Sequence, residues 1–227
     1  MTSRWCLHPF KRLLDCSTAL LMLCLLTSVI GAISVLVMAT MGRPVFFCQV
    51  RSGRAGVPFM LWKFRTMAAP LDSAGHEIPE GDRITRLGRW LRSSSLDELP
   101  QLMHVVQGTM SLVGPRPLLP RYLDRYSPAQ RRRLTVRPGL TGLAQTQGRN
   151  SLIWEQRFRL DVVYVESASF LLDARIICRT IVRLLRPTGI SAVGHPTSPE
   201  FLGAPIEGPD RGAAPVSDHQ AGPRSES

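Results

Sequence analysis

The pattern of apolar and polar positions divides the chain into three parts. Residues 17–41 are 25 consecutive residues without a charge, and this length exceeds the roughly 20 residues that a helix needs to cross a bilayer. The following residues alternate apolar segments with polar turns, whereas the last 40 or so are rich in Pro, Gly and Ser and contain few large apolar residues. The pattern predicts a membrane segment over 1–43, a folded domain over 44–186 and a disordered tail over 187–227.

The membrane segment has positive charge at both ends, so the positive-inside rule assigns it no orientation. Basic residues precede it at Arg4, Lys11 and Arg12 and follow it at Arg43, Arg51, Arg54, Lys63 and Arg65. Its C-terminal end gives no cleavage site typical of a signal peptide, so we expect it in the mature protein. Two topologies fit: an ordinary spanning helix, or a re-entrant segment that bends at Thr27-Ser28 and Gly31 and returns to the same face.

In the folded domain, the periodicity predicts mostly helix with a small β component. Residues 45–67 indicate two short strands around a glycine-rich turn, because apolar and aromatic residues flank a turn signal. Residues 68–82 are small and polar, as in a surface loop. Helical spacing of apolar residues recurs elsewhere. Helices are expected over 84–91, from Asp97-Glu98 to about Gln107, over 118–134 with an interruption at Ser127-Pro128, and over 154–185.

The last predicted helix is basic and amphipathic. Arginines lie between its apolar residues at Arg175, Arg179, Arg183 and Arg186. Such a helix suits an interface with anionic lipid. An internal helix with a solvated basic face fits the same pattern, so both interpretations stay open.

Composition adds a strong positive charge, which arginine supplies almost alone. The formal net charge is +11, and only Lys11 and Lys63 are lysines. This balance indicates an anionic partner: nucleic acid, an anionic membrane surface or a phosphorylated substrate. Nucleic acid is disfavoured, because the basic residues are scattered among apolar segments without zinc-finger or RNP-like spacing. The five cysteines lack CxxC spacing, which indicates small apolar residues in a reducing compartment.

An adjacent pair of acids, Asp97-Glu98, is the strongest candidate for chemistry. Pro100 fits only the first turn of the helix that follows, which places Leu96 or Asp97 near the N-cap. Carboxylates there face the positive end of the helix dipole, which favours their ionised form. An ionised Asp can attack phosphorus or hold Mg²⁺, and a second acid can complete a metal site. Alternatively, Asp97 merely caps the helix.

Arginines in or beside rigid turns favour the chemical interpretation. Arg92 precedes the acid pair, Arg116 stands between Pro115 and Pro117, and Arg137 precedes a proline. The planar guanidinium suits bidentate binding of phosphate, and flanking prolines restrict its direction. Acids beside phosphate-binding arginines, in a chain with a membrane segment, indicate phosphoryl transfer.

Six segments, in order over roughly residues 10–186, form a pattern more specific than any one of them. They are Lys11–Asp15, Trp62–Met67, Arg92–Gln101, Ser111–Pro117, Val136–Gly142 and Leu160–Val165. On these motifs the chain resembles the bacterial sugar transferases, small monotopic phosphoglycosyl transferases. The resemblance implies an enzyme that moves a sugar-1-phosphate from a UDP-sugar to polyprenyl (undecaprenyl) phosphate, the first membrane step of glycan or exopolysaccharide synthesis.

The resemblance also implies roles for individual residues. Asp97 would be the nucleophile, forming an aspartyl phosphosugar with release of UMP, and Mg²⁺ near Asp97 and Glu98 would neutralise the diphosphate. The substrate-binding residues expected from the motifs are Lys63, Arg65, Arg92, Pro115, Arg116, Pro117, Arg137, Arg149 and Asp161.

For topology, the resemblance implies a re-entrant helix-break-helix, interfacial amphipathic helices and a small catalytic domain on the cytoplasmic face of the bacterial inner membrane. The family usually places Ser-Pro at the break, whereas this chain has Thr27-Ser28, so the kink is less strongly specified. The identity of the sugar, the glycan pathway and assembly into a homo-oligomer stay open. The alternative function is a catalytically silent protein at the membrane interface whose arginines bind anionic lipid.

Overall fold

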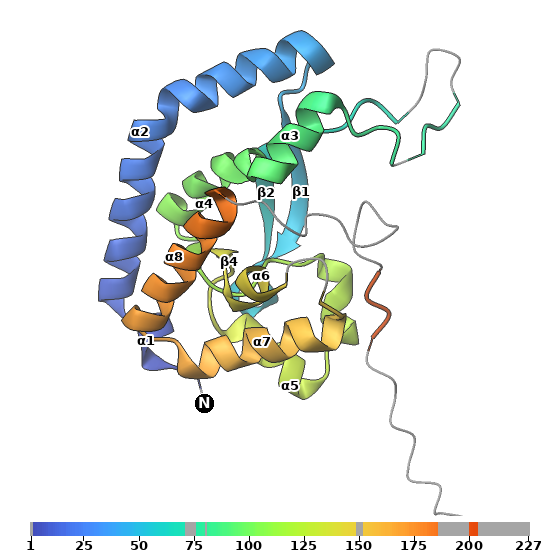
Figure 1. Cartoon of the computed structure of the whole chain (residues 1–227). Helices are drawn as coiled ribbons and strands as arrows, with labels where there is room; N and C mark the ends of the chain where they lie inside the picture. The colour runs from blue at the N-terminus through green and yellow to red at the C-terminus, as the bar shows by residue number, and fades with distance from the viewer. Residues whose placement is uncertain (1, 71–75, 80, 149–151, 186–199, 204–227) are drawn as a thin grey trace, which may run out of the picture.

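The structure is a computed structural model that describes residues 2–70, 76–79, 81–148, 152–185 and 200–203. It is mostly helical and contains two small two-stranded sheets (Figure 1), which confirms the predicted mixture of helix and strand. The α-helices are α1 (Arg4–Leu7), α2 (Pro9–Met41), α3 (Arg86–Ser94), α4 (Leu102–Gln107), α5 (Pro128–Arg131), α6 (Leu143–Gln147), α7 (Trp154–Ser167) and α8 (Phe170–Leu185). The 3₁₀ helices are η1 (Arg54–Gly56), η2 (Leu96–Gln101), η3 (Pro120–Arg125) and η4 (Arg132–Thr135), and the strands are β1 (Phe46–Ser52), β2 (Pro58–Phe64), β3 (Ser111–Val113) and β4 (Gly139–Thr141).

The long helix α2 carries the apolar segment and is anchored on the domain at both ends. Its first turns bury Lys11 and Ala19 against α4 and β3. Its last turns bury Ile33 and Val37 in a cluster with Leu91 of α3. Among the described residues, α2 is the one helix long and apolar enough to cross a membrane. Its two ends therefore lie on the same domain.

Helix α2 is continuous but bent. A straight helix of 33 residues would span about 50 Å, whereas the second half of α2 turns over α3 (Figure 1). Near the middle of the helix, the Thr27 hydroxyl donates to the carbonyl oxygen of Leu23 at 2.7 Å, and such back-bonding bends helices. The predicted break at Thr27-Ser28 is thus corrected to a bend within one helix.

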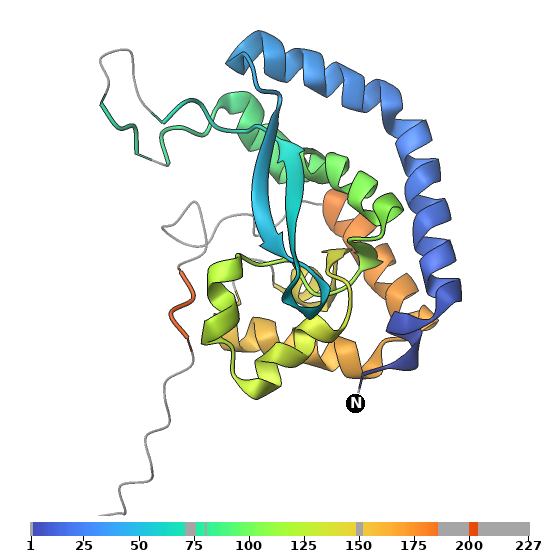
Figure 2. The same ribbon diagram turned by 180° about the vertical axis from the view of Figure 1, so that it is seen from behind.

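Strands β1 and β2 form the predicted antiparallel hairpin, with Phe47 opposite Lys63 and Arg51 opposite Phe59. The chain turns between them through η1, where Ala55 has a φ of 56°. The hairpin runs across the domain from the α3 side toward η3 (cyan in Figure 2), and β2 packs directly on η2. Because side chains alternate along a strand, the hairpin presents one consistent face to the acid pair.

The short parallel pair β3–β4 joins the two rigid turns predicted from the sequence. Ser111 lies opposite Gly139 and Val113 opposite Thr141. A Cβ atom on Gly139 would lie 2.0 Å from the backbone nitrogen of Gly114, so the two backbones approach as closely as glycine alone permits. This approach determines the position of the turn that carries Arg116.

Helices α7 and α8 close the domain opposite the hairpin. The predicted helix over 154–185 is therefore two helices, which separate at Ala168. In α8, Ile176 is fully buried while Leu171 and Val182 are exposed. Helix α8 thus contributes to the core, as expected of an internal helix. It also leaves apolar side chains on the surface, as expected of a helix at a lipid interface.

Four residues from the predicted tail, Glu200–Gly203, lie against the domain. Phe201 is buried among aromatic rings, and Glu200 forms an ion pair with Arg125 at 2.9 Å. The rings around Phe201 are those of Tyr122, Tyr126, Trp154 and Phe158. The other residues of the predicted tail lie outside the described part of the chain.

Candidate active site

The acid pair lies in the first turn of η2. The N-cap of this helix is Ser95, which has a left-handed backbone (φ 57°), and Asp97 is the second helical residue. The sequence placed the cap one or two residues later, at Leu96 or Asp97. Because Asp97 stands inside the helix, the alternative that it merely caps the helix is not supported.

Asp97 is almost completely buried, with 6% of its surface exposed. Burial, and then the neighbouring carboxylate of Glu98, raise the pKa of Asp97 to about 7, against the opposing effects of Lys63, Arg116 and Arg92. The expectation that the helix dipole favours the ionised form is therefore outweighed by desolvation. A carboxyl group poised near neutral pH and surrounded by cations is typical of functional sites.

Glu98 and Arg116 form an ion pair across the site, with Nη2 and Oε1 at 2.6 Å. The backbone of Arg116 is held from behind, because Arg133 Nη2 donates to its carbonyl oxygen at 2.5 Å. Arg133 is itself buried and paired with buried Asp161 at 2.9 Å. The Glu98 side chain and the Arg133–Asp161 pair thus position Arg116 from both sides.

Lys63 and Arg92 complete the cationic surroundings of Asp97. Lys63 stands on β2, where burial lowers its pKa and the charge of Asp97 opposes that effect. Arg92, on α3, donates from Nε to the hydroxyl of buried Thr66 at 3.0 Å. The structure therefore gathers Lys63, Arg92 and Arg116 around the acid pair, as the motifs indicated.

Other predicted binding residues form hydrogen bonds with the backbone or with another side chain of the domain. Arg65 donates to the carbonyl oxygens of Met67 and Arg43, and Arg137 donates to that of Gly108 at 2.8 Å. Asp161 contacts Arg133 at its carboxylate, so the structure gives it a positioning role in place of direct contact with the acid pair.

The two prolines and the remaining arginine complete the predicted set. The Pro115 carbonyl oxygen accepts a hydrogen bond from Gly139 at 2.9 Å, and Pro117 is buried. Both prolines therefore shape the turn that carries Arg116. Arg149 lies outside the described residues.

Three arginines that the sequence reasoning missed lie close to this site. Arg51 on β1 and Arg157 on α7 both have Arg116 as their strongest charged neighbour, and Arg133 anchors the Arg116 backbone. For Arg51 a signal was available: the two predicted strands form a hairpin, and strand alternation from Lys63 places Arg51 on the same face. Arg133 belonged to the Arg131–Arg133 run, which local sequence does not distinguish from a solvated surface.

The acid pair fits a divalent cation that is shared with a phosphorylated substrate. Among the described residues, no group of three or more His, Cys, Asp or Glu side chains could form an all-protein cage. Mg²⁺ is ordinarily held by one or two carboxylates together with substrate phosphates and water. Asp97 and Glu98 supply that donor set.

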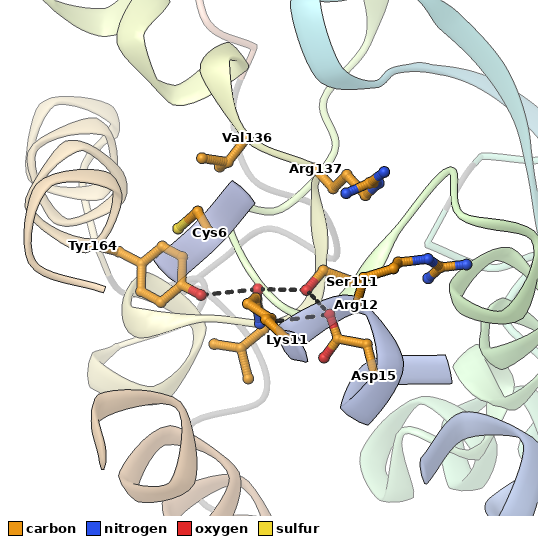
Figure 3. Close-up of a pocket in the computed structure, with 9 residues that line it drawn as sticks. Cys6, Lys11, Arg12, Asp15, Ser111, Val136, Arg137 and Tyr164 are labelled. Atoms are coloured by element: carbon orange, nitrogen blue, oxygen red, sulfur yellow. Dashed lines mark hydrogen bonds and ion pairs between the residues drawn. The ribbon is translucent and has the colours of Figure 1, made fainter. Parts of the chain in front are cut away.

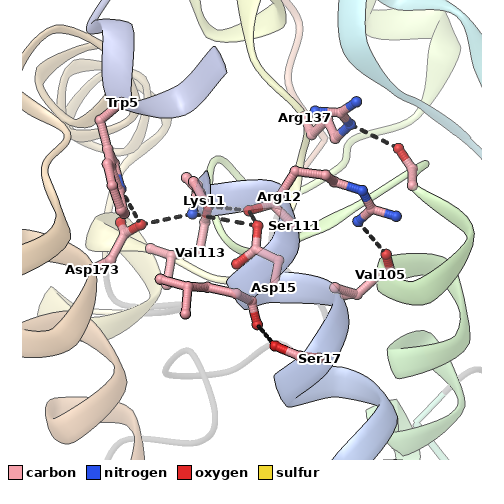
Figure 4. A network of polar contacts seen from close by, with 12 residues as sticks. Trp5, Lys11, Arg12, Asp15, Ser17, Val105, Ser111, Val113, Arg137 and Asp173 are labelled. Carbon is pink, nitrogen blue, oxygen red and sulfur yellow. Dashed lines mark hydrogen bonds and ion pairs between the residues drawn. The ribbon is translucent and has the colours of Figure 1, made fainter. Parts of the chain in front are cut away.

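A second buried polar cluster lies at the N-terminal end of α2, and its opposite charges are paired with one another. Lys11 Nζ lies 2.7 Å from Asp173 and 3.5 Å from Asp15, and Ser111 donates to Asp15 at 2.5 Å. Trp5 also donates to Asp173 at 2.7 Å. Figure 4 shows these residues converging from α1, α2, β3 and α8. The cluster, called the Lys11 network below, ties the start of the membrane helix to the domain.

The Lys11 network leaves little space for a ligand. The cavity beside it, which Tyr164 and Arg137 also line, is about 10 Å³ (Figure 3), enough for at most a single water molecule. Asp173 already accepts three hydrogen bonds, and Asp15 accepts one from Ser111 and lies 3.5 Å from Lys11. The network is therefore a structural element, and the acid pair is the candidate site.

The chain is similar to known proteins of one family over most of its length. Residues 6–187 match the model of the bacterial sugar transferase family. The chain is 47% identical to the uncharacterised sugar transferase EpsL of Bacillus subtilis, over 86% of this chain and 96% of that protein. It is 38% identical to the UDP-glucose:undecaprenyl-phosphate glucose-1-phosphate transferase of Caulobacter vibrioides, over 77% and 69%. It is 36% identical to the exopolysaccharide production protein ExoY of Rhizobium meliloti, over 75% and 83%. The resemblance seen in the six motifs is thereby confirmed, and the chain belongs to the bacterial sugar transferase family.

Proposed function

We propose that this protein transfers a sugar-1-phosphate from a UDP-sugar to undecaprenyl phosphate through an aspartyl intermediate, as an early membrane step of exopolysaccharide synthesis. The observation that carries the proposal is the buried Asp97 carboxyl, which lies among cations and whose pKa is raised to about 7 by burial and then by Glu98. Two relatives named as UDP-glucose:undecaprenyl-phosphate glucose-1-phosphate transferases and one named as an undecaprenyl-phosphate glucose phosphotransferase support the substrate class.

In the first step, an Asp97 carboxylate oxygen attacks the phosphorus that carries the sugar. A bond forms between this oxygen and phosphorus, and the bond from phosphorus to the oxygen bridging the two phosphates breaks. UMP leaves with the electron pair of that bond. Lys63 and Arg92, which act electrostatically on Asp97, would stabilise the negative charge that develops on the transferred phosphate.

In the second step, a phosphate oxygen of undecaprenyl phosphate attacks the same phosphorus. The new phosphorus–oxygen bond gives the undecaprenyl-diphosphate sugar, and the Asp97 carboxylate is released. Bound Mg²⁺, held by Asp97 and Glu98 with the substrate phosphates, would neutralise charge on the diphosphate. The Glu98–Arg116 ion pair keeps the guanidinium of Arg116 beside the reacting groups.

The proposal includes a re-entrant membrane helix that leaves both ends on the cytoplasmic side. Burial of Lys11 and of Val37 on the same domain supports it, since a straight spanning helix would separate its two ends by the bilayer thickness. Leu13, Leu25 and Val35 on α2 are exposed and suit contact with lipid. In a variant lacking native cysteines, Thr2→Cys should react with an impermeant maleimide in inside-out vesicles. Labelling of intact spheroplasts would overturn the topology.

The reaction is tested with purified protein, undecaprenyl phosphate, Mg²⁺ and a panel of UDP-sugars. We expect release of UMP with at least one donor, loss of that release in Asp97→Asn, and trapping of labelled sugar phosphate on the wild-type protein when acceptor is omitted. Asp124→Asn, at an exposed position, is the matched control and should keep full activity. Full activity in Asp97→Asn would refute the nucleophile, and absence of UMP release with every donor would favour a silent lipid-binding protein.

A further inference from the structure

The inner face of the β1–β2 hairpin carries a second cation besides Lys63. In the antiparallel register, Lys63 lies opposite Phe47, and Arg51 is four residues further along β1. Positions four apart on a strand project to the same side, roughly 13 Å apart. Lys63, at one end of this face, has Asp97 as its strongest charged neighbour, and Arg51, at the other end, has Arg116.

Backbone contacts place Arg51 beside the rigid turn. The next residue, Ser52, donates from its backbone nitrogen to the carbonyl oxygen of Leu118 at 2.8 Å, two residues after Arg116. Strand β1 also packs on η3, which follows that turn. The hairpin and the turn thus bring Arg51 and Arg116 together from segments 65 positions apart in the sequence.

The charge of Arg51 is incompletely compensated. Its Nη2 donates to Gln49 at 2.6 Å, whereas its buried Nε has no hydrogen-bond partner among the described residues. Burial, and then the charge of Arg116, lower the pKa of Arg51 to about 10; Arg121 acts in the same direction, whereas Tyr122 and then Glu98 oppose them. A buried donor without an acceptor and a desolvated cation beside other cations are both costly, and an anion relieves both costs.

A third arginine approaches from the opposite layer. Arg157 of α7 lies over the ring of Trp154, with its guanidinium carbon 4.5 Å from the ring centroid. Its strongest charged neighbour is Arg116. Three guanidinium groups from β1, the rigid turn and α7 therefore converge next to the acid pair. The carboxylates that act on them are Glu98, Asp97 and Asp161.

We propose that Arg51 and Arg116 form a second phosphate site beside Asp97, which holds the phosphate of the departing nucleotide. This inference rests on the proposed function. A nucleoside diphosphate sugar has two phosphates: the one attacked by Asp97 faces Lys63 and Arg92, and the other leaves as UMP. The leaving phosphate gains negative charge as its bond to the transferred group breaks, so a guanidinium fork there binds UMP and favours its departure.

The test compares Arg51→Gln with Arg54→Gln, an exposed arginine two residues from the end of β1. UMP is titrated into each purified protein by calorimetry, and KM is measured separately for donor and for undecaprenyl phosphate. Arg51→Gln should weaken UMP binding and raise the donor KM, each about 10- to 100-fold, and leave the acceptor KM within twofold. Arg54→Gln should match the wild type. Arg51→Lys, which keeps the charge and loses the fork, should fall between them.

Two results would overturn the site. UMP affinity of Arg51→Gln within twofold of the wild type would show that Arg51 does not hold the nucleotide. A rise in the acceptor KM with unchanged UMP affinity would assign the arginine to the lipid phosphate. If the wild type binds UMP but releases none from any UDP-sugar, the proposed reaction fails, while the calorimetric comparison still decides the phosphate site. If Arg51→Gln unfolds, Arg51→Lys carries the same comparison.

Discussion

The Lys11 network and the acid-pair site are both buried and charged, but they differ in how their charges are compensated. In the Lys11 network, Asp173 accepts hydrogen bonds from Trp5 and Lys11, and its second oxygen lies 2.8 Å from the Tyr164 hydroxyl. In the acid-pair site, the strongest charged neighbour of Asp97 is another acid, and that of Arg51 is another arginine. The Lys11 network pairs its opposite charges and thereby stabilises the fold. In the acid-pair site like charges lie close together and repel one another, and a bound ligand of opposite charge would reduce that repulsion.

The largest effect is expected from Asp97→Asn, which should lower turnover and raise thermal stability. Turnover should fall at least 1,000-fold, because the nucleophile is lost. Since burial raises the pKa of Asp97 to about 7, the folded state favours the protonated form, and ionisation destabilises it as the pH rises toward 7. The variant should therefore unfold at a higher temperature than the wild type, with a larger difference at pH 8 than at pH 5. A lower melting temperature at pH 8 would contradict this account.

Disruption of the Lys11 network should lower stability and leave the turnover of the folded protein unchanged. Lys11→Met leaves Asp173 and Asp15 buried without their cation, and breaking a buried pair from one side typically costs about 3–5 kcal/mol. Denaturant unfolding in detergent should report this loss, while the folded fraction keeps its turnover. Arg4→Met, at an exposed arginine of α1, is the control and should change stability little. Equal stability of the two variants would show that the Lys11 network does not stabilise the fold.

The pH dependence of turnover should sharpen the comparison further. If Asp97 attacks as a carboxylate, kcat/KM should fall about tenfold per pH unit below a midpoint near 7, and bound cations would shift this midpoint downward. Arg116 lowers the pKa of Asp97, so Arg116→Gln should move the midpoint upward as well as weaken substrate binding. Asp124→Asn should leave the profile unchanged. A profile flat from pH 5 to 9 would exclude Asp97 as the titrating group.

The smallest effect is expected at the docked C-terminal residues. Phe201 fills the aromatic cluster around Tyr122 and Phe158, and Phe201→Ala removes the burial of this ring, so the free energy of unfolding should fall by about 1.5–3 kcal/mol, less than on disruption of the Lys11 network. Leu202→Ala removes an 82% exposed side chain and provides the control. Thermal melts of the two variants test whether these residues contribute to the fold; indistinguishable melting temperatures would show that they do not.

Much of the local structure could be predicted because its causes are local. The β1–β2 hairpin follows from two apolar segments around a glycine-rich turn, and α5 begins at Ser127-Pro128 with a capping box, as the start signal indicated. The rigid turn before Arg116 was visible in its prolines. The break in α2 was predicted from the family pattern and is corrected to a bend, because a hydroxyl hydrogen bond deforms a helix without ending it.

The sequence by itself determined that this chain has one long apolar helix, a β-hairpin, an acid pair before a proline and six ordered motifs of the sugar transferases. Each depends on neighbouring residues or on spacing along the chain. Only the tertiary structure decided which charges meet: Arg51 joins Arg116, Asp161 pairs with Arg133, and Arg137 lies at Gly108. The physical reason is that desolvation and charge compensation depend on distances between segments far apart in sequence, which packing sets and local pattern does not.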